Sequence, residues 1–284
     1  MNNFITRTLT GILFVGVLVG AILYSPVTFC LLFAVITGMA VWEFGTLINK
    51  GGEAVVNRPI CTLAGVYLFF AVMGFNQGMA RGEIFVPYLL TLIYLLVAEL
   101  YLRRPNPVSD WAYTMMSQLY VALPFVLVSV LYFYPIQVVD GDSVSVATSP
   151  ILSLSLFIFL WASDSGAYMV GSLIGKHRLF ERISPKKSWE GSIGGGVLAI
   201  VAAWCLWYFF PIMSLVQWIG MSLVVVVFGT WGDLVESLMK RHLGIKDSGN
   251  ILPGHGGILD RFDSAMLAIP AVVVYLYTFS LVLG

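Results

Sequence analysis

Apolar runs long enough to cross a lipid bilayer recur along the whole chain. A helix needs about 20 residues to cross ~30 Å of hydrocarbon, and a mean hydropathy of +0.91 over 284 residues is far above that of a soluble domain. Such runs predict helices, because lipid-exposed backbone must satisfy its hydrogen bonds within the segment. We therefore predict an all-α, polytopic transmembrane bundle of about nine spans, at residues 8–24, 27–48, 60–79, 84–102, 112–134, 150–174, 191–210, 214–232 and 264–283.

The distribution of Lys and Arg predicts the orientation of these spans. With nine spans, fourteen of the fifteen Lys and Arg residues fall on one side and Arg81 alone falls on the other. Cytoplasmic loops carry such an excess, so we expect a cytoplasmic N-terminus, a C-terminus on the opposite side and a location in the cell's inner (plasma) membrane. A basic cytoplasmic face suits anionic membrane lipids and phosphorylated substrates, and no nucleic-acid partner is expected.

The chain is expected to form a single membrane domain, residues 1–284, with two halves of different character. Residues 1–149 are read mainly as scaffold helices, and residues 150–284 as a catalytic half with cytoplasmic loops at 175–190 and 233–263. The three cysteines lie inside predicted spans without a pairing pattern, which indicates neither disulfides nor a zinc site. No internal repeat is apparent.

Acidic residues gather where the last two spans meet the cytoplasm. If the eighth span continues as a helix beyond the membrane, Asp233, Glu236 and Lys240 lie on one face. Asp260 and Asp263, three residues apart, are likewise expected to share a face where the ninth span begins. Carboxylates at two helix ends would form a cytoplasmic-side pocket, and such oxygen ligands suit Mg²⁺.

The stretch "SGNILPGHGG" between these acids is rich in Gly and Pro, so its backbone N–H groups can approach a phosphate closely. It lacks the Walker pattern. The surrounding cations Lys240, Arg241, Lys246 and Arg261 could neutralise a polyphosphate. His255 is either a general base or hydrogen-bond donor, or a structural loop residue, which is the commoner role of a lone loop His.

Two further regions of the second half carry polar residues near the membrane. Asp164 in the sixth span either has a functional role or is bonded to neighbouring hydroxyls to hold helices together. The run "SPKKSWEG" contains Ser184, Lys186, Lys187 and Ser188 just before a Gly-rich helix start, whose N–H groups favour an anion. Close helix packing is the other explanation for those glycines.

In the first half, Glu43 is an intramembrane acid. We read it as a helix-packing residue near the cytoplasmic face, where the acids of the second half lie.

The stretch from Ser237 to Asp263, "SLMKRHLGIKDSGNILPGHGGILDRFD", resembles the signature of the CDP-diacylglycerol synthase (phosphatidate cytidylyltransferase) family. The pattern S-x-hydrophobic-K-R, K-D, P-x-H-G-G and D-R-x-D is filled in order. The upstream runs "DSGAYMVGSLIGKH" and "SPKKSWEG" are also similar to that family, with Ser188 where Thr is common. The resemblance is dense over about residues 160–264 and weak before them.

The resemblance implies an integral membrane enzyme that condenses CTP with phosphatidic acid to CDP-diacylglycerol and pyrophosphate, for phospholipid biosynthesis. It implies Mg²⁺ at Asp233, Asp260 and Asp263, leaves room for a second cation such as K⁺, and suggests a homodimer by analogy. We expect catalytic roles for Asp233, Asp260, Asp263, Lys240 and Arg261. We expect substrate-binding roles for Ser184, Lys186, Lys187, Ser188, Ser237, Arg241, Lys246, Asp247, His255, Gly256, Gly257 and Asp164.

Two other functions remain open at this point. A CTP-dependent lipid kinase, acting on a polyprenol or phytol, would use the same metal chemistry but leave CDP rather than pyrophosphate. A cation-coupled transporter would use Asp164 and the acidic cluster as ion sites, although the missing repeats and the position of the acids at one face argue against it.

Overall fold

The computed structural model describes residues 3–140, 143–249 and 256–283. Their contacts divide the chain into two compact units, which are described separately. Unit 1 comprises Met1–Val130 and His242–Phe262, and unit 2 comprises Leu131–Arg241 and Asp263–Gly284. The prediction of one membrane domain with a catalytic half from residue 150 stays a prediction.

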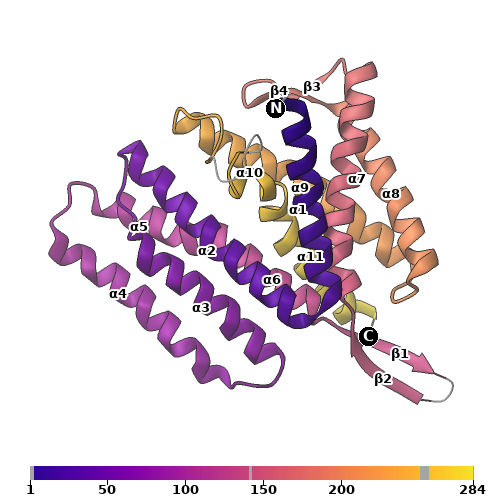
Figure 1. Cartoon of the computed structure of the whole chain (residues 1–284), viewed down its shortest axis with the longest axis horizontal. Helices are drawn as coiled ribbons and strands as arrows, with labels where there is room; N and C mark the ends of the chain where they lie inside the picture. The colour runs from indigo at the N-terminus through magenta and orange to yellow at the C-terminus, as the bar shows by residue number, and fades with distance from the viewer. Residues whose placement is uncertain (1–2, 141–142, 250–255, 284) are drawn as a thin grey trace. The chain divides into compact units, whose positions relative to one another are not determined.

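Unit 1 is built from long apolar helices (Figure 1). They are α1 (Asn3–Tyr24), α2 (Pro26–Gly51), α3 (Arg58–Asn76), η1 (Gly82–Phe85) leading into α4 (Val86–Leu102), and α5 (Pro107–Met116), the π-helical turn η2 (Ser117–Ala122) and α6 (Leu123–Tyr132) in one continuous run. Helices α2, α3 and α5 each begin with Pro at their first or second position, where the missing N–H costs nothing. Exposed Leu89, Leu90 and Ile93 give α4 an apolar outer face, as expected for a helix in lipid.

A short helix, α10 (Leu259–Phe262), also belongs to unit 1. Its Phe262 is buried and makes edge-to-face contacts with Phe14 on α1 and Phe125 on α6, with ring centroids 5.7 Å and 5.1 Å apart. Such aromatic pairs contribute about 0.5–1.5 kcal/mol beyond their buried area. They anchor the end of the signature stretch in the core of unit 1.

Among the residues of unit 2 that the structure describes are two β-hairpins and four long helices (Figure 1). In the first hairpin β1 (Pro135–Asp140) pairs antiparallel with β2 (Ser143–Thr148), and in the second β3 (Arg178–Phe180) pairs with β4 (Ser184–Ser188), Arg178 opposite Ser188. The helices are α7 (Pro150–Ile174), α8 (Trp189–Phe209), α9 (Leu215–His242) and α11 (Ala265–Leu283).

Glycines allow α7 and α8 to approach closely. A Cβ atom built on Gly195 would lie 2.6 Å from the Ser163 carbonyl oxygen, and one on Gly166 would lie 2.7 Å from that of Gly194. A side chain cannot fit at such distances, so small residues are required where these backbones meet. Close helix packing therefore explains the Gly-rich entry to α8.

The predicted all-α polytopic bundle is confirmed. Among the described residues, eight helices are long and apolar enough to cross a membrane, and the apolar part of α1, Thr8–Tyr24, is shorter. Helix α9 continues to His242, so the acids that follow the eighth predicted span lie on a helix, as expected.

The start of the ninth span differs from the expectation. Helix α10 ends at Phe262 and α11 begins at Ala265, so Asp263 lies in a turn rather than on the helix face that carries Asp260. The Asp263 carboxylate accepts the Ser264 N–H at 2.6 Å. This local bond competes with the helical hydrogen-bond pattern at that position.

Candidate active site

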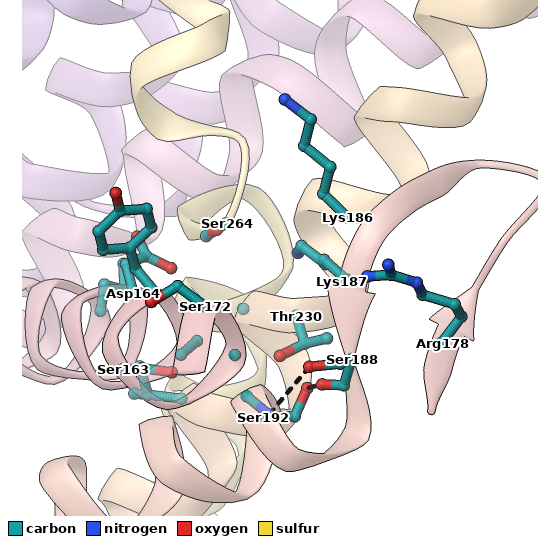
Figure 2. Close-up of a pocket in the computed structure, with 17 residues that line it drawn as sticks. Ser163, Asp164, Ser172, Arg178, Lys186, Lys187, Ser188, Ser192, Thr230 and Ser264 are labelled. Atoms are coloured by element: carbon teal, nitrogen blue, oxygen red, sulfur yellow. Dashed lines mark hydrogen bonds between the residues drawn. The ribbon is translucent and has the colours of Figure 1, made fainter. Parts of the chain in front are cut away.

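A cavity of about 430 Å³ lies within unit 2 (Figure 2). Its walls come from α7, the β3–β4 hairpin, the first turn of α8, α9 and the turn before α11. The polar residues that line it are Ser163, Asp164, Ser172, Arg178, Lys186, Lys187, Ser188, Ser192, Thr230 and Ser264. One side of the lining is thus cationic, and the other carries a carboxylate and hydroxyls.

The hairpin supplies the cations. Arg178 on β3 and Lys186 and Lys187 on β4 line the cavity, with Asp164 and Ser163 on α7 across from them (Figure 2). Lys186 is exposed, whereas the Lys187 side chain is 28% exposed. Three cations on a two-stranded support suit an anionic ligand such as a phosphate.

Lys187 links the hairpin to α9. Its ammonium forms an ion pair with Oδ2 of Asp233, and Ser237 Oγ donates to Oδ1 of the same carboxylate at 3.0 Å. Asp233 and Ser237 are one helical turn apart, so the extension of α9 places them on one face. The predicted extension of the helix past Asp233, Glu236 and Lys240 is confirmed, and Lys240 binds Glu236 at 3.1 Å.

Three carboxylates of unit 2 lie within electrostatic range of one another. Asp263 interacts with Asp233, Asp164 and Lys240, and Asp164 interacts with Lys187. Glycines on α9 permit this proximity, because a Cβ atom on Gly232 would lie 2.6 Å from the Asp263 carbonyl oxygen. Any side chain at Gly232 would push the turn that carries Asp263 away from Asp233.

Ser188 ends the hairpin and caps α8. Its hydroxyl accepts the Gly191 N–H at 3.2 Å, and the residue is buried. Glu190 accepts the N–H groups of Lys176 and His177 at 3.2 Å and bonds His177 Nδ1 at 2.6 Å. A cap hydroxyl satisfies a helix-end N–H group, which accounts for a hydroxyl at position 188. The "SPKKSWEG" run therefore forms the strand, the cap and the first turn that hold Lys187.

Unit 1 holds the middle of the signature. There Oδ2 of Asp260 accepts the Ser248 N–H at 2.8 Å, the Ser248 hydroxyl at 2.9 Å and the Gly257 N–H at 2.9 Å. Lys246, Asp247 and Arg261 are exposed. His255 lies outside the described residues.

The expected site residues thus fall into two sets. Unit 2 contains Asp164, Ser184, Lys186, Lys187, Ser188, Asp233, Ser237, Lys240, Arg241 and Asp263, and unit 1 contains Lys246, Asp247, Gly256, Gly257, Asp260 and Arg261. Of the unit 2 set, Asp164, Lys186, Lys187 and Ser188 line the cavity. The others do not: Ser184, Asp233, Ser237, Lys240, Arg241 and Asp263. Within either unit taken alone, the described residues group no three His, Cys, Asp or Glu side chains suited to a metal. The metal set Asp233, Asp260 and Asp263 draws on both units and stays a prediction.

Sequence reasoning missed several residues that line the cavity. Arg178 follows "GKH" and counted only as a topological charge, although its place next to the conspicuous lysines could have singled it out. Ser192, Thr230 and Ser264 carry no pattern, since single hydroxyls near a membrane helix are common. Only the folded arrangement reveals them.

The whole chain is similar to known cytidylyltransferases. The sequence model of the "Cytidylyltransferase family" matches residues 5–279. A phosphatidate cytidylyltransferase of Staphylococcus haemolyticus is 33% identical over 273 residues, covering 95% of this chain and 98% of the relative. One of Haemophilus influenzae is 32% identical over 294 residues, covering 97% and 99%. The chain therefore belongs to the cytidylyltransferase family.

Proposed function

We propose that this protein is a phosphatidate cytidylyltransferase that condenses CTP with phosphatidic acid to CDP-diacylglycerol and pyrophosphate. The relatives that bear this name align with nearly the entire chain. The membrane-spanning helices fit a lipid substrate. The signature stretch and the "SPKKSWEG" run carry the polar residues the reaction needs.

The observation that carries the proposal is the cavity of unit 2, where a cationic hairpin faces the Asp164 carboxylate. Both substrates are polyanions, so the reaction needs charge neutralisation and alignment more than a strong base. Arg178 can bind a phosphate through two N–H groups, and Lys186 and Lys187 add point charges. The hydroxyls of Ser192 and Thr230 can orient phosphate oxygens.

Two of the three carboxylates proposed to bind a divalent cation, Asp233 and Asp263, lie in unit 2. Asp233 pairs there with Lys187, and Asp263 lies within electrostatic range of Asp233 and Asp164. Carboxylate oxygens of this kind are the ligands that Mg²⁺ prefers. Asp233 and Asp263 would hold Mg²⁺ together with Asp260, and a second cation such as K⁺ is compatible with the same donors. When bound, Mg²⁺ supplies charge neutralisation at the substrate phosphates.

The proposed reaction is an in-line displacement. An oxygen of the phosphatidate phosphate attacks the α-phosphorus of CTP, and the bond from that phosphorus to the bridging oxygen breaks, so that pyrophosphate leaves with the electron pair. Arg178 and Lys187 align the two anions and stabilise the charge that develops on the leaving group. Further positive charge near the membrane surface comes from four residues of the signature stretch, Lys240, Arg241, Lys246 and Arg261.

We place the active site on the cytoplasmic side of the inner membrane. CTP comes from the cytoplasm, and the Lys and Arg of the predicted cytoplasmic loops include every cation named above. A site at the interface can admit CTP from water and the lipid from the bilayer. Association as a homodimer is part of the proposal by family analogy.

The decisive test incubates the purified protein with phosphatidic acid, Mg²⁺ and CTP radiolabelled at the α-phosphate. We expect labelled CDP-diacylglycerol and one pyrophosphate per lipid, abolished by chelator and by Asp233→Asn. Glu83→Gln, which also replaces a carboxylate by an amide but at an exposed position outside the cavity, should retain activity. Release of CDP with a phosphorylated lipid would instead identify a lipid kinase. No labelled lipid, under conditions where a known synthase is active, would reject the proposal.

A further inference from the structure

Glu43 is a buried acid of α2 that the proposed reaction does not use. It lies within a predicted span and is 5% exposed. Its carboxylate accepts the N–H groups of Ile258 at 2.9 Å and Leu259 at 3.1 Å, and it also accepts the hydroxyl of Ser248. Burying a carboxylate is costly unless its hydrogen bonds are satisfied, and here the donors lie more than 200 residues away in the sequence.

Ser248 connects Glu43 to Asp260. The Ser248 hydroxyl contacts both carboxylates, and the Ser248 N–H donates to Oδ2 of Asp260 at 2.8 Å. Because a hydroxyl carries one hydrogen, the two carboxylates share a single donor. A change at Glu43 therefore reaches Asp260 through the shared hydroxyl, and also through the backbone of Ile258 and Leu259, whose N–H groups Glu43 accepts.

Gly256 and Gly257 lie so close to the carboxylates of Asp260 and Glu43 that neither position has room for a side chain. A Cβ atom on Gly257 would lie 2.0 Å from Oε1 of Glu43 and 2.3 Å from Ser248 Oγ. Gly256 has φ +81°, and a Cβ there would lie 2.4 Å from Oδ2 of Asp260. Residues with side chains avoid both situations. The backbone of residues 256–259 is thus in direct contact with Glu43 and Asp260.

These contacts do not match a helix-packing acid. Among the described residues, the hydrogen bonds of Glu43 go to Ser248, Ile258 and Leu259, which belong to the signature stretch, and none goes to a neighbouring long helix. By accepting these hydrogen bonds, Glu43 holds three residues of the signature stretch in one conformation. Residues around metal sites commonly orient the metal-binding carboxylates through hydrogen bonds of this kind.

We infer that Glu43 is a positioning residue, which fixes the segment 256–260 through Ser248 and so sets the orientation of the Asp260 carboxylate and the Gly256–Gly257 backbone toward a bound metal and nucleotide. The inference rests on the proposed function. It goes beyond the signature, because Glu43 lies far outside it in the sequence.

The test compares Glu43→Gln and Ser248→Ala with the unmodified full-length protein in detergent. Glutamine keeps the shape of Glu43 but turns an NH₂ group toward donors. We expect the Mg²⁺ concentration for half-maximal CDP-diacylglycerol synthesis to rise about 10- to 100-fold in both variants, with the KM for phosphatidic acid unchanged. In metal-free protein, the amides of Ile258 and Leu259 should exchange hydrogen faster.

Glu99→Gln is the matched control, since Glu99 is a mostly buried acid of the same unit that binds Arg104 at 2.9 Å, away from the signature segment. It should keep the Mg²⁺ dependence of the unmodified protein. The inference is overturned if Ser248→Ala or a folded Glu43→Gln shows unchanged Mg²⁺ dependence and amide exchange, or if Glu43→Gln unfolds while Ser248→Ala behaves as the parent protein. An inactive parent protein with faster amide exchange in the variants would reject the proposed function and keep the positioning role.

Discussion

At the scale of residues, the Lys187–Asp233 pair joins the two kinds of group that the proposed reaction requires. The two side chains are 28% and 25% exposed, so the pair is partly screened by water. An ion pair of this exposure contributes at most about 1 kcal/mol to stability. Because Lys187 lines the cavity of about 430 Å³, its position favours a role in binding over one in folding.

We predict that Lys187→Gln lowers kcat/KM for CTP by about 10- to 100-fold, equivalent to ~1.4–2.8 kcal/mol of transition-state stabilisation. The substitution removes a positive charge from the cavity wall. It should change Tm by little, and Lys187→Arg should recover part of the activity because the charge returns. Steady-state kinetics with labelled CTP provides the measurement.

Lys176→Gln is the control for this prediction. Lys176 is exposed, follows the end of α7 and does not line the cavity. Equal losses in both variants would show that general positive charge, rather than the position of Lys187, supports the reaction.

At the scale of elements, the contact between α7 and α8 distinguishes two neighbouring glycines. A Cβ atom on Gly195 would lie 2.6 Å from the Ser163 carbonyl oxygen, whereas on Gly196 the nearest atom, of Val226, is 4.0 Å away. Gly195→Ala should destabilise the protein by about 1–3 kcal/mol, because the helices must separate. Gly196→Ala should be neutral or slightly stabilising, since Ala is the better helix former. Thermal unfolding of both variants in the same detergent measures the difference, and equal Tm values would contradict the packing described for this pair.

Elements were predictable where the sequence signal is local. Long apolar runs fix the spans, and the fifth predicted span, 112–134, is covered by α5, η2 and α6 despite a π-helical turn. The β3–β4 hairpin was missed, because "RLF" and "SPKKS" are too short and too polar to show strand periodicity. The turn at Asp263 was also missed. It involves one hydrogen bond, from the Ser264 N–H to the Asp263 side chain, which leaves no pattern in the sequence.

The candidate site was predictable only in part, because its contacts join residues that are far apart in the sequence. The lysines of "SPKKSWEG" and Asp164 were identified from their residue types, and the structure places them around one cavity. That Glu43 binds Ser248 and Ile258 could not be predicted, since no spacing relates them. The signature itself is continuous in sequence but divided between the two units after Arg241 and after Phe262.

At the scale of the whole molecule, the role of α1 determines the arrangement of the two termini. Helix α1 has 22 residues and is therefore about 33 Å long, enough to cross ~30 Å of hydrocarbon, although its apolar part, Thr8–Tyr24, is shorter. With α1 spanning, the eight longer helices make nine spans, and an odd number puts the termini on opposite sides.

We therefore predict that a reporter at the N-terminus is cytoplasmic and that one at the C-terminus lies on the other side. Paired fusions to a fluorescent protein that matures only in the cytoplasm and to a phosphatase active only outside it measure both ends. A phosphatase-positive C-terminus with a fluorescent N-terminus confirms nine spans. Two phosphatase-positive termini would mean that α1 lies at the membrane surface and does not cross. The Lys and Arg of the later loops would keep the second half in place, because positive charge near the ends of the spans holds those loops in the cytoplasm.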